Sequence, residues 1–254
     1  MPTAMSEKFT GTPILKVISE YCMENVNDQR LQELAHEDMP LYARRVWGLF
    51  RPAIPLFNTP AEMPIYLLGT SDDPHIQEPK YDSNTIVIPT EQTENYTVAL
   101  GEDFIGYELF SCRIRVVDEL GNIYLYPTDI ASYNAETGDV TFNASVEQPL
   151  EENTTYEMDF YTDGHFKYEL SPEIMLVLGV CFQYTWQNRF NTDYLSLVPK
   201  VEDRSFTEQN RANKERADTE RLNEIKRNMA EAMRRYEQVI AQRNTIRPRI
   251  GGIF

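Results

Sequence analysis

The chain has 254 residues and carries 24 lysines and arginines against 40 aspartates and glutamates, which gives a net charge of −16 at pH 7. It is long enough to bury a core as one main domain with an appendage. The sequence contains no apolar run of about 18 residues, and no basic segment followed by an apolar stretch near its start. We therefore expect neither a membrane-spanning helix nor a signal peptide.

Residues 1–51 have apolar side chains at helical spacing, and we expect them to form the N-terminal helices of a small platform. Thr12-Pro13 has the form of an N-cap followed by a first-turn proline. Asn27 or Asp28 is expected to cap a second short helix, and Pro40 to start a third.

Residues 52–170 are expected to form an inserted antiparallel β-domain. Four prolines interrupt the helical pattern because each removes a backbone donor: Pro52, Pro55, Pro60 and Pro64. The apolar period then changes to two, and it predicts strands at 85–90, 96–100, 107–117, 123–126, 129–134, 140–143 and 155–161.

Glycine-containing turn signals separate these strands, at 119–122, at 136–139 and at Asp163-Gly164. They favour hairpins, because Gly paired with Asn or Asp tolerates the positive φ of tight turns. Short strands at such regular spacing predict an antiparallel sandwich or small barrel.

Residues 171–199 are expected to contain the buried central helix of the platform and a linker. Ser171-Pro172-Glu173 is a helix start signal, and 173–189 is apolar nearly all round. The predicted fold class is therefore α+β, with a small helical platform, an inserted antiparallel β-sandwich or barrel domain, and a long C-terminal helix.

Residues 200–254 are expected to form that long, charged helix, from about 205 to 243, followed by a basic tail. At about 1.5 Å per residue the helix would reach about 60 Å. Apolar residues alternate at spacings of three and four along Leu222, Ile225, Met229, Ala232, Tyr236 and Val239. This short heptad seam has two interpretations: it folds back on its own body, or it contacts another subunit. We favour the second, because the helix is longer than one compact body needs.

Charge distinguishes this segment from the rest of the chain. Residues 200–254 hold 13 basic and 9 acidic residues, which leaves 11 and 31 for residues 1–199, so the nets are +4 and −20. Acids are interleaved with bases along most of the helix, as in the i,i+4 pair Glu231 and Arg235. The last arginines lack acidic neighbours in the sequence and precede an apolar end. The residues expected to bind a partner are Leu222, Ile225, Met229, Tyr236, Val239, Arg243, Arg247, Arg249, Ile250 and Phe254.

No pattern indicates chemistry. His36, His75 and His165 have no metal-ligand spacing, and Cys22, Cys112 and Cys181 are far apart, as expected of reduced, buried thiols. His165 is expected to be a turn residue. The sequence contains no P-loop, GxGxxG, GxSxG or calcium-loop pattern. We therefore predict no catalytic, metal-binding or cofactor-binding residue, and no enzyme.

Two other functions remain open. The β-domain could bind carbohydrate or another protein, as in a baseplate or receptor-binding module. Alternatively, the chain could be a DNA-associated packaging protein, with Arg243, Arg247 and Arg249 contacting phosphates.

The order of elements resembles that of a head-to-tail connector, or neck-ring adaptor, a structural protein of tailed bacteriophages, as in crAss-like phages. Three segments carry the resemblance: the apolar helix SPEIMLVLGVCFQYTWQNRF, the β-segment YNAETGDVTF, and the charged end MRRYEQVIAQRNTIRPRIGGIF.

The resemblance implies a virion protein, assembled in the host cytoplasm, of which about a dozen copies form a homo-oligomeric ring. It implies that the C-terminal helix docks on neighbouring subunits, on the portal or on adjoining ring or tail proteins. It also implies that genomic DNA passes through the ring without specific binding, and an acidic body suits this because it repels DNA. No membrane partner is implied.

Overall fold

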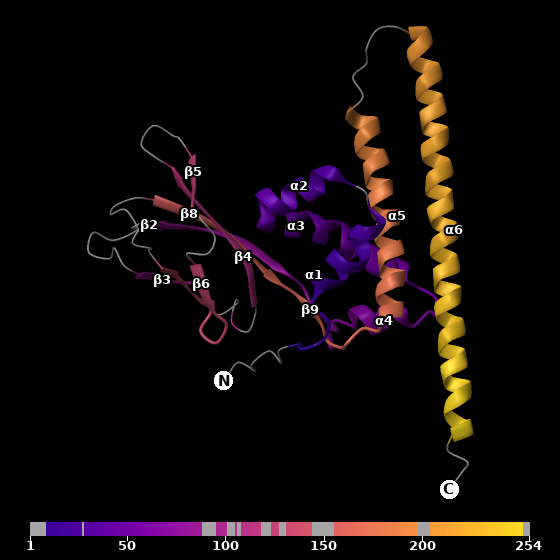
Figure 1. The fold of residues 1–254 in the computed structure, drawn as a ribbon, viewed down its shortest axis with the longest axis horizontal. Helices are drawn as coiled ribbons and strands as arrows, with labels where there is room; N and C mark the ends of the chain where they lie inside the picture. The colour runs from indigo at the N-terminus through magenta and orange to yellow at the C-terminus, as the bar shows by residue number, and fades with distance from the viewer. Residues whose placement is uncertain are drawn as a thin grey trace. The chain divides into compact units, whose positions relative to one another are not determined.

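The structure is a computed structural model, and it describes residues 9–26, 28–87, 95–100, 105, 108–117, 123–126, 131–143, 155–197 and 204–250 (Figure 1). The chain divides into two compact units. The first comprises Met1–Leu15, Asp28–Trp47 and Ile76–Tyr168, and the second comprises Lys16–Asn27, Gly48–His75 and Glu169–Phe254. Each unit is built from segments that are far apart in the sequence.

The helices of the first unit begin at short acidic side chains. Helix α2 spans Gln29–Glu37, and Asp28 Oδ1 accepts the N–H groups of Arg30 at 3.0 Å and Leu31 at 3.2 Å. Of the two predicted candidates, Asp28 is therefore the N-cap of α2. Helix α3 spans Met39–Phe50, with the predicted starter Pro40 as its second residue. It leaves the first unit after Trp47.

The first unit contains three antiparallel sheets. The four-stranded sheet has the order β2-β8-β4-β5, with strands at Lys80–Val87, Thr155–Asp163, Glu108–Val117 and Ile123–Tyr126. The three-stranded sheet has the order β3-β7-β6, at Asn95–Ala99, Asp139–Asn143 and Ala131–Asn134. The short strands β1 (Ile76–Gln77) and β9 (His165–Phe166) pair with each other. The chain is therefore α+β, as predicted. The strand pairing within the three sheets does not show closure into a barrel or sandwich.

The two faces of β8 differ in chemistry, as strand alternation requires. Met158 and Phe160 are buried on one face. On the other face, Arg115 of β4 lies 3.1 Å from a carboxylate oxygen of Glu157 and 3.1 Å from one of Asp159. Charge pairing thus joins the central strands on one side, and apolar burial stabilises the other.

The predicted turns have different outcomes. Gly138 has φ of 73°, and its N–H donates to the Asn134 carbonyl at 2.8 Å, so the predicted hairpin joins β6 to β7. Asp163-Gly164 is not a hairpin, because β9 pairs with β1 instead of turning back on β8. His165 accordingly lies in β9 and not in a turn. The turn predicted at 119–122 lies outside the described residues.

The second unit is helical, and its elements correct the predicted start of the β-domain. Residues 52–170 begin with the 3₁₀ helix η3 (Arg51–Leu56) and helix α4 (Met63–Leu68), and the first strand starts only at Ile76. Pro52 and Pro64 lie in the first turns of these helices, where a missing N–H costs little. Pro52 and Pro64 therefore start new helices, whereas the sequence pattern was interpreted only as the end of the helical region.

The remaining helices pack around α5, which spans Pro172–Leu197. Helix α1 (Ile14–Val17) continues as a π-helical turn, η1 (Ile18–Cys22), and a 3₁₀ turn, η2 (Met23–Asn25). Helix α6 spans Arg204–Ile250 and lies along α5 (Figure 1). As predicted, α5 starts after Ser171 and is largely buried, and Phe182 packs against Phe50 with ring centroids 6.4 Å apart.

Candidate functional site

Helices α5 and α6 form an antiparallel pair, and two contacts between side chains show their direction. A guanidinium nitrogen of Arg243 lies 2.5 Å from Glu173 Oε1 in the first turn of α5. Further along, Lys226 Nζ lies 5.6 Å from the centroid of the Tyr184 ring, within cation–π range. The earlier residue of α5, Glu173, contacts the later residue of α6, Arg243, so the two helices run in opposite directions.

The predicted seam is used within the chain. Ile225 and Tyr236 are buried, and the Tyr236 ring packs edge-on against Phe57 with a centroid distance of 5.2 Å. Its hydroxyl lies 3.7 Å from the sulfur of Met63. The other four seam residues are only half-buried: Leu222, Met229, Ala232 and Val239. The intrachain interpretation therefore holds for Ile225 and Tyr236.

Met233 is buried but was absent from the predicted seam. A seam of strict three- and four-residue steps follows a period of 3.5, whereas a straight helix turns once in about 3.6 residues. That mismatch amounts to only about 20° in seven residues, whereas Met233 lies about 100° around the helix from Ala232. The buried side of α6 is therefore wider than one heptad seam.

The predicted arginine cluster divides into two parts. The sequence suggested that Arg243 has no acidic partner. In the fold it contacts Glu173, which lies 70 residues away in sequence. Arg247, Arg249 and Ile250 lie in α6, and their side chains are outside the description. Phe254 lies outside the described residues.

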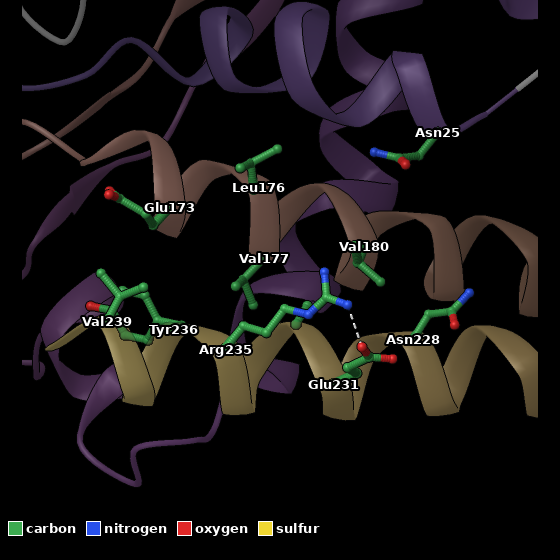
Figure 2. A pocket seen from close by; sticks show the side chains of 11 residues that line it. Asn25, Glu173, Leu176, Val177, Val180, Asn228, Glu231, Arg235, Tyr236 and Val239 are labelled. Carbon is green, nitrogen blue, oxygen red and sulfur yellow. Dashed lines mark hydrogen bonds and ion pairs between the residues drawn. The ribbon is translucent and has the colours of Figure 1, made fainter. Parts of the chain in front are cut away.

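A pocket of about 420 Å³ lies along one side of the α5–α6 contact (Figure 2). Helix α5 contributes Leu176, Val177 and Val180, and the facing part of α6 contributes Ala232 and Val239. The remaining lining residues are Asn25, Glu173, Asn228, Glu231, Arg235 and Tyr236. We call this site the α5–α6 pocket.

The pocket exists because small side chains lie where two helices would otherwise interlock. Asn228 and Ala232 are one turn apart on α6, and they leave the space that larger residues fill at Ile225 and Tyr236. Across the pocket, Leu176 is 55% exposed, although α5 is apolar enough to predict burial all round.

Charged groups at the edge of the pocket pair with one another. Arg235 forms an ion pair with Glu231 one turn earlier on α6, and Figure 2 shows the arginine extended along the pocket. Its own backbone N–H, the Ser171 hydroxyl and the Arg243 guanidinium lower the pKa of Glu173, so this carboxylate stays ionised. Each acid has a basic partner, and the pocket therefore favours neutral, apolar groups over ions.

Elsewhere in the described residues, His75 has polar partners, and Cys22 and Cys181 are buried. His75 Nδ1 lies 3.0 Å from the Tyr66 carbonyl oxygen, and its Nε2 lies 3.1 Å from an Asp73 carboxylate oxygen. Cys22 and Cys181 are buried and reduced. In the part of the chain that the structure describes, His, Cys, Asp and Glu do not gather in groups of three that could hold a metal ion. None of the described helices combines the length and apolar character needed to cross a membrane.

Comparisons of the chain with protein-family models, curated proteins and solved structures found no match.

Proposed function

We propose that the chain is a virion structural protein that forms a homo-oligomeric ring in the head-to-tail connector of a tailed phage, through which genomic DNA passes. The role is structural and needs no catalysis or cofactor. In this proposal, α6 docks on neighbouring subunits, on the portal or on adjoining ring or tail proteins.

The observation that carries the proposal is a line of arginines on the outer side of α6. Arg216, Arg227 and Arg234 are exposed, and separations of 11 and 7 residues place them on one side of the helix. Ile225 and Tyr236, which are buried against the same unit, lie on the opposite side. Three exposed arginines thus line the outer side of α6, flanked by Glu220, Glu231 and Glu237, while residues 1–199 carry a net charge of −20.

This distribution supports self-association rather than DNA binding. The line of arginines on one copy complements the acidic body of the next, which steers assembly and fixes which surfaces meet. The whole chain has a net charge of −16, so a DNA duplex is repelled by the body even where α6 attracts it. A ring with this charge would let DNA slide through without adhering.

The β-strands suit a rigid ring body. We propose that the three-stranded sheet, through β6, packs on the four-stranded sheet, through β4, as the two layers of a sandwich; β4 and β6 lie close enough in space to allow it. Two such layers bury the apolar face that includes Met158 and Phe160.

Light scattering of the purified chain at increasing concentration tests the proposal. We expect a closed ring of fixed mass, and half-assembly at a concentration at least about tenfold higher for the triple variant Arg216→Glu, Arg227→Glu and Arg234→Glu. The matched triple Lys variant keeps the charge and should assemble as the wild type does. A chain that stays monomeric, alone and with portal and tail proteins, would refute the ring.

Retention on DNA distinguishes the packaging alternative. Binding that falls steeply with salt and is lost on neutralising Arg243, Arg247 and Arg249, from a chain that does not assemble, would favour a DNA-associated role.

A further inference from the structure

We infer that the α5–α6 pocket receives the apolar residues Ile253 and Phe254 of a second copy of the chain. The inference rests on the proposed self-assembly and gives it a specific contact. It assigns the pocket as the acceptor and the Gly-Gly-Ile-Phe segment that follows α6 as the donor.

The chemistry of the two parts is complementary. The pocket is lined mainly by apolar side chains, and its charged groups are already paired as Arg235 with Glu231 and Arg243 with Glu173. A charged occupant would have to break these pairs, whereas a branched aliphatic and an aromatic side chain would not. A volume of about 420 Å³ is within the range of pockets that bind small ligands.

The same chain cannot supply this occupant. Helix α6 continues to Ile250, 11 residues beyond Val239, the lining residue of α6 that is nearest its end, which places Ile250 about 16 Å along the helix from the pocket. Four residues in fully extended conformation span at most about 14 Å, so Phe254 of the same chain cannot fill a pocket that extends a further seven residues to Ala232. The contact is therefore between copies, and because donor and acceptor are different surfaces it is head-to-tail, as ring closure requires.

The exposed residue Leu176 provides a variant that tests the acceptor without disturbing the core. Leu176→Asp places a charge at the pocket and removes apolar surface. Ile65→Asp is the matched control, because Ile65 on α4 is 59% exposed and does not line the pocket. The donor variant is the full chain with Ile253→Asp and Phe254→Asp.

Two measurements are made on these chains. The first is binding of a fluorescent peptide with the sequence of residues 246–254, Ile-Arg-Pro-Arg-Ile-Gly-Gly-Ile-Phe, to the donor variant, whose pocket is intact. We expect saturable binding, at least about tenfold weaker when Leu176→Asp is added and unchanged when Ile65→Asp is added. The second is the mass of the acceptor and donor variants, alone and mixed.

The mixing experiment is decisive because each variant lacks a different half of the contact. Each variant alone should assemble at concentrations at least about tenfold above wild type. An equimolar mixture should form a one-to-one complex through the intact pocket of one copy and the intact Ile253 and Phe254 of the other.

The outcomes separate the inference from the ring. A wild-type ring whose assembly is unchanged in both variants overturns the inference and leaves the ring in place. A monomeric wild type whose pocket still binds the peptide supports the pocket assignment and refutes the ring. A monomeric wild type that does not bind the peptide refutes both.

Discussion

The carboxylate of Asp163 accepts the backbone N–H of Leu15, 148 residues earlier in the chain, at 3.2 Å from Oδ1 and 3.3 Å from Oδ2. Oδ1 also accepts the N–H of Gly164 at 2.8 Å, and the N–H of Ile14 donates to the Gly164 carbonyl at 2.9 Å. The first amides of a helix have no acceptor within it, so the end of β8 supplies the cap for α1. The side chain that does this is 6% exposed.

We predict that Asp163→Ala lowers the free energy of unfolding by about 2–3 kcal/mol, because it leaves buried N–H groups without an acceptor. Asp163→Asn keeps one acceptor oxygen and should lose roughly half as much. Urea unfolding measures both variants. The control is Asp72→Ala, at an exposed loop position, which should change the free energy by less than about 0.5 kcal/mol. Equal effects at the two positions would contradict the capping role.

The crossing of α5 over η1 gives a second prediction. A Cβ added at Gly179 would lie 2.5 Å from the Tyr21 carbonyl oxygen and 3.1 Å from Asn25 Nδ2, so the helices approach at a contact only glycine permits. Gly179→Ala should therefore cost about 1–3 kcal/mol in unfolding free energy.

Gly48 is the matched control for this substitution. It is an exposed position in α3, and a Cβ there would meet no atom within 4 Å. Gly48→Ala should stabilise the chain by roughly 0.5–1 kcal/mol, since alanine loses less backbone entropy in a helix. Opposite signs for the two substitutions, measured by urea unfolding, are the expected result. A stabilising Gly179→Ala would show that the close approach is not tight.

Local patterns predicted the elements well, and non-local contacts were missed. The period-two pattern placed both ends of β4, β5 and β8 within two residues, because strand alternation is set by neighbours in sequence. The start of α5 after Ser171 was also readable, since proline and a short cap act within one turn.

Contacts between distant segments have no local signature. The path from β8 into β9 depends on β1, which lies nearly ninety positions earlier and is only two residues long. The pairing of Arg243 with Glu173 depends on the packing of α6 along α5, which joins residues 70 positions apart. The α5–α6 pocket could not be foreseen, because it is a property of two faces and not of either helix.

The buried thiols of Cys22 and Cys181 give a prediction about pH. Burial raises the pKa of Cys22, and the nearby Cys181 adds to this; burial raises the pKa of Cys181 to about 12. In a Cys112→Ser background, we expect neither thiol to react with a disulfide reagent at pH 8 in the folded chain, and both to react in urea. Rapid reaction without denaturant would show that the packing of η1 on α5 opens readily.

The same shifts determine how stability changes in alkali. Unfolded thiols ionise near pH 8.5, whereas the folded chain keeps these two protonated to higher pH. Between these values the unfolded state binds fewer protons, so stability is fully present below about pH 8.5 and is lost as pH rises towards the folded values. We expect the free energy of unfolding to fall by about 1 kcal/mol per pH unit or more between pH 9 and 11. In the double variant Cys22→Ala and Cys181→Ala, the fall of the unfolding free energy with pH should be less steep, whatever the variant's stability at pH 7. An unchanged slope would assign the alkaline loss of stability to other groups. Tyr161 is one such group, because burial raises its pKa as well.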